Sequence, residues 1–398
     1  MITITKADTI ISQNIPSFGV EKIPLEKAYG RILQENISAD RNLPSFDKAL
    51  MDGIAINLTS FKKGSRTFKI ESIQAAGQTQ KKLRSLRGCF EIMTGSVVPT
   101  GCDCDIPIEN VSINNGLATI NTLKLNAGEN IRPQGSDHKK GERLLRKGVV
   151  LLSPQMAIAA SVGQTTVTVT QKPNVAVIST GDEIVPINKS KIKSFEIRQS
   201  NSHFIKWALD QTRLFDSTIF HFRDDKKLLL NKIGTILKRF DVLVLTGGVS
   251  MGKFDYVPQV LKELDVKVLF HKVQQRPGKP FWFGKRGRKI VFALPGNPVS
   301  TQIGTYRYVI PHLKKAVGAN QSRELAVLTK NFSVDTNFAV FLPVKIQFDK
   351  KAQLAVTPIE TGGSGDFGSL GESDGFIELP AGQKIFKAGF VSQLFRWS

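Results

Sequence analysis

Four glycine-bearing turns stand at the ends of apolar runs, and they constrain the fold more than any other feature of the sequence. They read VAVISTGDE (175–183), DVLVLTGGVSMG (241–252), RPGKP (276–280) and IVFALPGNPVS (290–300). Short β-branched runs that end in glycine turns and lead into helical patterns are typical of an open α/β sheet. Such turns expose backbone N–H groups that can bind phosphate or another oxyanion. The same glycines would also serve in plain tight turns.

Strand and helix patterns alternate around these turns. Strands are expected near 175–180, 216–222, 241–246, 266–272 and 289–293. Helices are expected near 201–211, 225–239, 255–264 and 298–317. Ser200 and Asp225 are plausible N-caps for two of these helices. Helices of this length between strands imply βαβ crossovers and a parallel sheet, so residues 171–320 are predicted to form a doubly wound α/β domain.

The rest of the chain is expected to form smaller domains, since 398 residues exceed the size of a single core. Residues 1–40 follow a helical pattern that ends near 28–30, and residues 138–170 contain a probable helix at 154–162 and a strand at 165–170. These two segments are assigned to one linking domain. Residues 41–137 form a small β-rich domain, and the alternating short runs of 321–398 suggest a small β-barrel.

Composition excludes several classes of protein. No run of 18 apolar residues occurs, and the N-terminal MITITKADTI has no basic region followed by a hydrophobic core. The sequence therefore predicts neither a membrane span nor a secretory signal, and it favours the cytoplasm. Three cysteines argue against a disulfide scaffold. Cys102 and Cys104 form a C-x-C without a second ligand pair, so structural cysteines are favoured over a metal site.

The formal net charge of +21 would attract polyanionic ligands. Residues 61–90 carry eight Lys or Arg against one Glu, and residues 271–290 carry seven without an acid. Few aromatic residues interleave with these charges and no nucleic-acid motif is present, so nucleic acid is the disfavoured partner. A general surface bias and an anionic small-molecule substrate both remain compatible with the charge.

Carboxylates also stand in the glycine-bearing segments. Asp182, Glu183 and Asp255 accompany Lys279, although each acid alone could be a solvated surface group or a cap. Oxyanion-binding turns mixed with carboxylates suggest a metal-bridged phosphate ligand. No histidine lies in these turns, so a Ser-His-Asp or Cys-His nucleophile is not indicated, and phosphoanhydride chemistry needs none.

Nine segments, in order, resemble the molybdopterin molybdenumtransferase family (MoeA proteins and the related domain of gephyrin-type proteins). They are ALMDGIA (49–55), IMTGSVVP (92–99), NIRPQGSD (130–137), STGDE (179–183), GGVSMG (247–252), DYV (255–257), PGKP (277–280), LPGNPVS (294–300) and GSGDFGSL (363–370). The resemblance implies a multidomain α/β plus β fold, with a doubly wound molybdopterin-binding domain in an elongated protomer. It implies a homodimer whose cleft lies between the α/β domain of one chain and the β domains of the other.

The resemblance also implies a reaction and a set of site residues. The family inserts molybdenum from molybdate into adenylylated molybdopterin and releases AMP, assisted by Mg²⁺, and a molybdopterin adenylyltransferase could supply the substrate. The catalytic positions fall on Asp52, Thr94, Asp137, Glu183, Asp255 and Lys279. The cofactor-binding positions fall on Arg132, Gly247, Gly248, Ser250, Arg276, Gly296, Asn297 and Ser300. The implied metal ligands are Glu183, Asp225 and Asp255.

Three positions depart from the family pattern. Ile54 replaces the usual aromatic residue after MDG, Arg276 replaces a frequent lysine, and Lys253 stands where an acid is common. The basic net charge is unusual as well. Two alternatives to the molybdenum enzyme stay open on the sequence: a non-catalytic molybdopterin-binding scaffold of the same fold, and a paralogue that inserts tungstate.

Overall fold

The computed structural model describes residues 1–249, 255–319, 323–350, 352–360 and 362–397. The chain divides into two compact units. Unit 1 comprises residues 1–35, 147–152 and 166–398, and unit 2 comprises residues 36–146 and 153–165. Within the described residues, no helix is both long enough and apolar enough to cross a membrane.

The central sheet of unit 1 lies in the predicted α/β region. Its strand order is β16 (Asp216–Phe222), β13 (Asn174–Thr180), β17 (Val242–Thr246), β21 (Lys289–Leu294), β20 (Trp282–Arg286) and β18 (Lys267–His271). The strands from β16 to β21 are parallel, whereas β20 pairs antiparallel with both β21 and β18. All five predicted strands, including β18, therefore run in the same direction, and only β20, which was not predicted, runs antiparallel to them. The PGKP segment between β18 and β20 contains no crossover helix, so the chain returns antiparallel.

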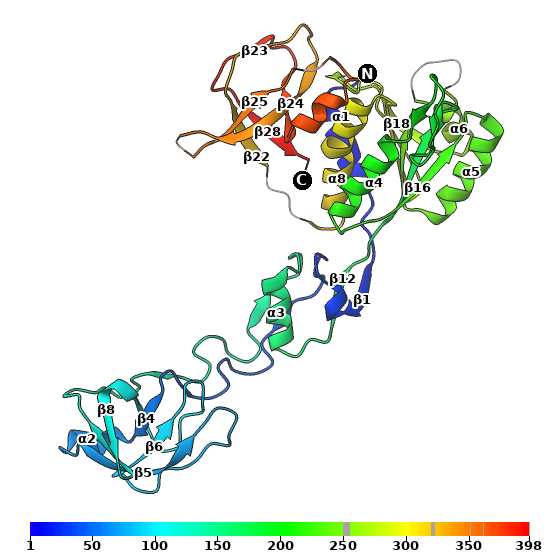
Figure 1. Ribbon diagram of the computed structural model, residues 1–398. Coiled ribbons are helices and arrows are strands. Elements are labelled where there is room, and N and C mark those ends of the chain that lie inside the picture. Colours follow the sequence, from blue (N-terminus) through cyan, green and yellow to red (C-terminus); the bar gives the residue numbers. More distant parts are fainter. Residues whose placement is uncertain (250–254, 320–322, 351, 361, 398) are drawn as a thin grey trace. The chain divides into compact units, whose positions relative to one another are not determined.

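Helices cover both faces of this sheet. One face packs on α1 (Ile4–Asn14), α4 (Asn201–Gln211), α7 (Pro298–Gly304) and α8 (Ile310–Ala316), and the other packs on α5 (Lys226–Arg239) and α6 (Val257–Glu263) (Figure 1). Alternate residues of β13 serve the two cores: Val177 faces the first and Ile178 the second. The multidomain α/β plus β fold with a doubly wound sheet is therefore confirmed. The predicted helix at 298–317 includes a π-helical turn at Thr305–Val309 between α7 and α8.

The order of connections creates a switch point between β13 and β17. From β13 the chain passes through α4 to β16 on one side, whereas from β17 it passes through α6 to β18 on the other side. Neighbouring strands whose connections diverge in this way leave a crevice beyond their carboxyl ends. The GDE and TGG turns follow these two strands directly.

The C-terminal part of unit 1 is a closed sheet. Its strands are β22 (Glu324–Leu328), β24 (Ala339–Phe348), β25 (Leu354–Pro358), β26 (Gly375–Leu379) and β28 (Val391–Arg396). The ring closes because β24 pairs with β25 and also with β26. The short strand β19 (Gln275–Arg276) adds to β24. The PGKP segment therefore joins the barrel to the α/β sheet. Two short strands, β23 (Phe332–Ser333) and β27 (Ile385–Phe386), pair beside the barrel.

The N-terminal segment differs from its prediction. Helix α1 ends at Asn14, and β1 (Val20–Pro24) pairs antiparallel with β12 (Thr166–Thr170). The helical pattern expected as far as 28–30 is therefore wrong beyond Asn14. Pro16 cannot continue a helix, and the stretch after Gly19 alternates between exposed and half-buried positions, as a strand does.

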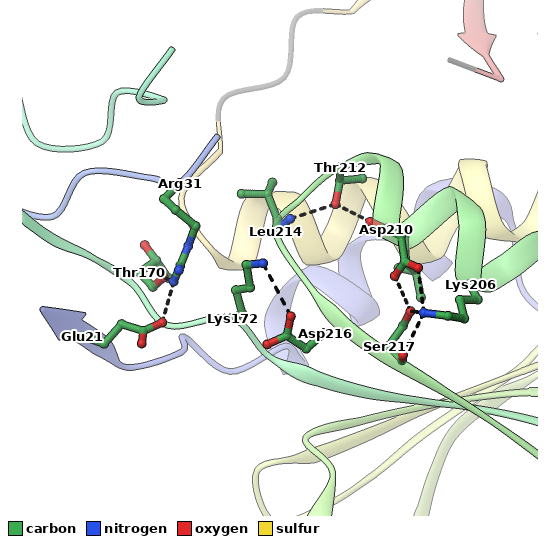
Figure 2. A network of polar contacts seen from close by, with 11 residues as sticks. Glu21, Arg31, Thr170, Lys172, Lys206, Asp210, Thr212, Leu214, Asp216 and Ser217 are labelled. Carbon is green, nitrogen blue, oxygen red and sulfur yellow. Dashed lines mark hydrogen bonds and ion pairs between the residues drawn. The ribbon is translucent and has the colours of Figure 1, made fainter. Parts of the chain in front are cut away.

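Figure 2 shows polar contacts within the β1–β12 ribbon, within the α/β domain, and between the two, where Nζ of Lys172 after β12 donates to Oδ1 of Asp216 on β16 at 3.5 Å. The buried Arg31 donates from Nη2 to Oε1 of Glu21 at 2.5 Å and to the carbonyl oxygen of Thr170 at 2.7 Å. Farther along, Nζ of Lys206 on α4 donates to Asp210 at 2.7 Å and to the carbonyl oxygen of Ser217 on β16 at 3.1 Å. These bonds tie α4 to the neighbouring strand.

Unit 2 contains a mixed sheet with its own core. The strand order is β7 (Cys104–Pro107), β4 (Gly53–Ile56), β6 (Gly88–Ile92), β5 (Thr67–Gln74), β9 (Leu117–Ile120) and β8 (Val111–Asn114). The helices are α2 (Leu58–Lys62) and α3 (Ser153–Ser161), and the short strand pairs are β2 (Ile37–Ser38) with β11 (Arg143–Leu145) and β3 (Lys48–Ala49) with β10 (Ile131–Arg132). Burial raises the pKa of the Cys89, Cys102 and Cys104 thiols to about 12, which disfavours the thiolate needed for metal binding.

Candidate functional site

The glycine turns at the carboxyl edge of the sheet pack directly against one another. Gly247 and Gly248 have φ values of 90° and 65°. A Cβ atom on Gly247 would lie 2.8 Å from the carbonyl oxygen of Thr180, and one on Gly248 would lie 2.8 Å from its hydroxyl. A Cβ atom on Gly296 would lie 3.5 Å from Cα of Gly247. Close approach to Thr180, and not turn geometry alone, therefore requires Gly247 and Gly248, whereas Gly296 makes an ordinary packing contact with Gly247.

Amide and hydroxyl side chains hold these turns in register. Asn201, at the start of α4, donates from Nδ2 to the carbonyl oxygen of Gly296 at 2.7 Å and to Oγ1 of Thr246 at 3.2 Å. Asn297 donates from Nδ2 to Oγ of Ser364 at 2.9 Å. The bond between Asn297 and Ser364 joins the GSGDFGSL loop of the C-terminal region to the LPGNP turn. Ser200 occupies the predicted N-cap position of α4, but its side chain makes no capping bond.

A pocket of about 520 Å³ opens where these segments meet the barrel. It brings together four residues predicted for the site: Arg276, Lys279, Asn297 and Ser300. Nζ of Lys279 lies 5.4 Å from the ring centre of Phe338, so the ammonium group lies beside an aromatic wall. The pocket therefore combines two cations with hydroxyl and amide groups and an apolar lining. The other lining residues include Phe332, Val340, Phe341, Leu342, Pro343 and Ser364.

Acidic side chains gather beyond β13 and β16. The carboxylate of Glu183 folds over Gly181, where a Cβ atom would lie 2.7 Å from Oε2. Burial raises the pKa of Asp224, and the negative charge of Glu183 raises it further. Asp182 and Asp255 contribute to the same field. The charges of the other three acids therefore act on Asp224.

Two neighbouring acids, Asp224 and Asp225, stand between β16 and α5. Oδ1 of Asp225 accepts the backbone N–H of Leu228 at 2.7 Å, so this side chain caps α5 as the sequence predicted. The neighbouring Asp224, which the sequence analysis missed, shares the field of Glu183 and Asp255. The sequence already assigned Asp225 as an N-cap. This assignment was the available signal that its carboxylate is engaged by α5 and that a neighbouring acid could take the other role. Within the described ranges, no group of three or more His, Cys, Asp or Glu side chains could hold a metal ion.

Unit 2 brings predicted residues together in two pairs. Oδ1 of Asp52 accepts from the backbone N–H of Thr94 at 2.7 Å and from its hydroxyl at 2.8 Å. The backbone bond first, and the hydroxyl second, lower the pKa of Asp52, so this acid is ionised at neutral pH. Nη2 of Arg132 lies 2.6 Å from Oδ1 of Asp137 in an exposed ion pair.

One buried acid in unit 2 was not singled out from the sequence. Asp105 lies on β7 and accepts two backbone N–H groups of the turn that precedes Asp52. The second aspartate of the stretch CDCDIPI, which stands inside an otherwise apolar strand, was the available signal. Two other residues of the sequence analysis, Ser250 and Lys253, lie outside the described residues.

Comparison with known proteins identifies the family. Residues 2–163 match the MoeA N-terminal region (domain I and II), residues 176–315 match a probable molybdopterin binding domain, and residues 326–391 match the MoeA C-terminal region (domain IV). The chain is 36% identical to the molybdopterin molybdenumtransferase of Synechocystis over 400 residues, which cover 100% of both chains. The chain belongs to the molybdopterin molybdenumtransferase family.

Further relatives agree. The molybdopterin molybdenumtransferase of Staphylococcus epidermidis is 32% identical over 376 residues, covering 93% of this chain and 89% of the relative. A solved molybdopterin biosynthesis MoeA protein from Pyrococcus horikoshii superposes with a TM-score of 0.85 at 31% identity, covering 100% of this chain and 99% of that one. The resemblance found in the sequence is thus confirmed. As a molybdopterin molybdenumtransferase family member, the chain is a transferase of molybdenum cofactor biosynthesis that processes a molybdopterin-related substrate.

Proposed function

We propose that this chain inserts molybdenum from molybdate into adenylylated molybdopterin and releases AMP. The observation that carries the proposal is the pocket in which Arg276 and Lys279 stand with Ser300 beside the packed glycine turns. Two cations and a hydroxyl suit a small dianion such as molybdate. A pocket of about 520 Å³ also suits a small-molecule substrate.

The other site residues take complementary roles in this proposal. Gly247 and Gly248, with Gly296 beside them, are placed to offer backbone N–H groups to a pterin phosphate, and a side chain at Gly247 or Gly248 would meet the neighbouring turn. Asp52, ionised and held by Thr94, can accept a proton or orient a bound group. The Arg132–Asp137 pair presents a guanidinium that can bind phosphate once the partners separate.

A divalent cation such as Mg²⁺ fits the acidic side chains by chemistry. Within the described residues Glu183, Asp224 and Asp255 do not form a ready three-ligand site, so one or two of these carboxylates would hold Mg²⁺ together with phosphate oxygens of the substrate. Burial, and after it the charge of Glu183, raises the pKa of Asp224, and a bound cation would relieve the charge. When bound, Mg²⁺ would neutralise charge on the phosphoanhydride. Asp224 therefore replaces Asp225 in the proposed ligand set, because Asp225 caps its own helix.

The matched pair Asp224→Asn and Asp225→Asn tests this ligand set. Asp224→Asn is expected to raise the Mg²⁺ concentration needed for half-maximal AMP release about tenfold, as loss of one ligand charge would. Asp225→Asn should leave it unchanged, because asparagine is an equally good N-cap. The assignment fails if the Asp225 variant shows the larger effect.

The function itself is tested by AMP release from adenylylated molybdopterin, with and without molybdate and Mg²⁺. Release that requires both ions, with product able to reconstitute an apo-molybdoenzyme, supports the proposal. Tight binding without release would instead indicate a scaffold. Equal or faster turnover with tungstate would indicate the tungstate paralogue. Asp52→Ala and Asp137→Ala should each abolish release with the fold intact.

We also propose that the protein forms a homodimer, receives its substrate from a molybdopterin adenylyltransferase and is located in the cytoplasm. In the cleft that the family resemblance implies, both chains of a dimer contribute residues. A two-fold symmetric dimer therefore has two equivalent clefts. Sedimentation of the full chain would test the dimer.

A further inference from the structure

A buried carboxylate supports the turn that carries Asp52. Asp105 has no exposed surface. Its Oδ2 accepts the backbone N–H of Leu50 at 3.2 Å and that of Met51 at 3.1 Å. These are the two residues directly before Asp52. The main chain of Asp105 is fixed as well, because its N–H donates to the carbonyl oxygen of Glu129 at 3.0 Å.

The surroundings of Asp105 are unfavourable for a carboxylate. Its register partner on β4 is Ala55, which belongs to a small apolar cluster with Ala49 and Ile92. Among the described residues, Oδ1 of Asp105 has no hydrogen-bond partner. Burial raises the pKa of Asp105 to about 6, the two N–H bonds oppose this rise, and the charge of Asp52 adds to it. An apolar side chain would satisfy packing at this position without the cost of a buried charge.

We propose that Asp105 is a positioning residue, whose ionised carboxylate holds the turn at residues 50–52 and so keeps Asp52 against Thr94. This inference rests on the proposed function, in which Asp52 acts on the substrate. An ionised acceptor binds backbone N–H groups more strongly than a neutral one. Protonation of Asp105 therefore loosens the turn, and Asp52 loses its fixed orientation.

Other ionisable groups lie on the elements around Asp105. Asp52 stands on the turn itself and stays ionised through the range in which Asp105 titrates, because Thr94 lowers its pKa. The remaining groups lie on β3, on β6, on β7 and the two residues before it, and on β10 and the segment before it: Lys48, Glu91, Cys102, Asp103, Cys104, Glu129 and Arg132. The thiol of Cys102 stays protonated there, since burial raises its pKa to about 12. A change in the turn near pH 6 therefore reports on Asp105.

Hydrogen exchange of the full chain tests the hold on the turn without any substrate. In the wild type, protection of the Met51 amide should fall about tenfold between pH 7.5 and pH 5, as a charge-assisted bond becomes neutral. Protection of the Leu50 amide should fall less, because its N–H also donates to the carbonyl oxygen of Asn130 at 2.9 Å. In Asp105→Asn, protection should be as low at every pH as it is in the wild type at pH 5. Asp103→Asn is the matched control: Oδ1 of Asp103 accepts the N–H of Leu58 at 2.7 Å in the same unit, but it does not touch this turn.

AMP release tests the consequence for the reaction. Asp105→Asn should lower kcat about tenfold, leave KM for adenylylated molybdopterin within about twofold, and remove the acid limb near pH 6, as loss of orientation would. Unchanged kcat and an unchanged acid limb would overturn the proposal, as would amide protection equal to that of the wild type. If Asp105→Asn does not fold, the wild type alone decides: amide protection in the turn that does not change between pH 7.5 and pH 5 would overturn the proposal. If the wild type releases no AMP, the proposed function is refuted. The hydrogen-exchange result then decides by itself whether Asp105 holds the turn.

Discussion

At the residue scale, unit 2 shifts the pKa values of two nearby carboxyl groups, those of Asp52 and Asp105, in opposite directions. Two donors from Thr94 lower the pKa of the exposed Asp52, whereas burial raises the pKa of Asp105 to about 6. Environments that separate the pKa values of nearby carboxyl groups are a recurring mark of sites that need one fixed charge. Here the exposed acid is free to meet a ligand and the buried one serves the backbone.

The raised pKa of Asp105 predicts a stability change with a definite sign. The folded chain binds this proton near pH 6 and the unfolded chain near pH 3.8, so folding is penalised above pH 6 and the penalty disappears as pH falls towards 4. A shift of about two units corresponds to about 3 kcal/mol. Asp105→Asn should therefore raise the thermal transition of unit 2 at pH 8 and have little effect at pH 4.5. A lower transition at pH 8 would contradict this.

The sequence was informative at the residue scale where a side chain acts within its own segment. Asp225 followed an N-cap pattern, and the structure confirms the cap. The same local logic could not show that Asp224 shares a field with Glu183, because those residues meet only when β13 and β16 pair. It could not show that Asp105 supports residues 50 and 51 either, since that contact spans more than fifty residues.

At the element scale, the glycine turns predict a sharp difference between two alanine substitutions. Gly248 and Gly287 both have positive φ, at 65° and 56°. A Cβ atom on Gly248 would lie 2.8 Å from Thr180 Oγ1 and from Val257 Cγ2, whereas no described atom lies within 4 Å at Gly287. Gly287→Ala should cost only the conformational penalty of about 1–2 kcal/mol. Gly248→Ala should also displace the TGG turn and abolish AMP release. Equal activity of the two variants would show that close packing of the turn is dispensable.

Much of the parallel part of the sheet was predictable because β13 and β17 are buried β-branched runs, and because the amphipathic helix α5 precedes β17. The antiparallel strand β20 was not, because the PGKP segment before it has no periodic pattern. The helical pattern at the N-terminus was misleading for a related reason. Val20 and Ile23 fit a helical spacing, but Pro16 and Gly19 separate them from α1.

At the scale of the whole molecule, a buried arginine joins three parts of unit 1. Arg307, in the π-helical turn, donates from Nη1 and Nη2 to Asp8 on α1 at 2.9 and 2.8 Å and from Nε to Glu378 on β26 at 2.7 Å. The N-terminal helix, the α/β sheet and the barrel therefore share one ion cluster. The molybdate pocket proposed above is lined by both the α/β turns and the barrel, so its shape depends on how firmly these parts are joined.

Arg307→Met tests this joint, because it leaves two acids without their buried partner. We expect a loss of about 3–5 kcal/mol, as for other broken buried pairs. Lys345→Met is the matched control: its ion pair with Asp374 on the barrel surface, at 3.1 Å, is exposed and worth about 1 kcal/mol or less. If the joint also shapes the pocket, Arg307→Met should weaken molybdate binding in calorimetry below its thermal transition, while Lys345→Met should not. Equal stability of the two variants would mean that the apolar core alone joins the barrel to the sheet.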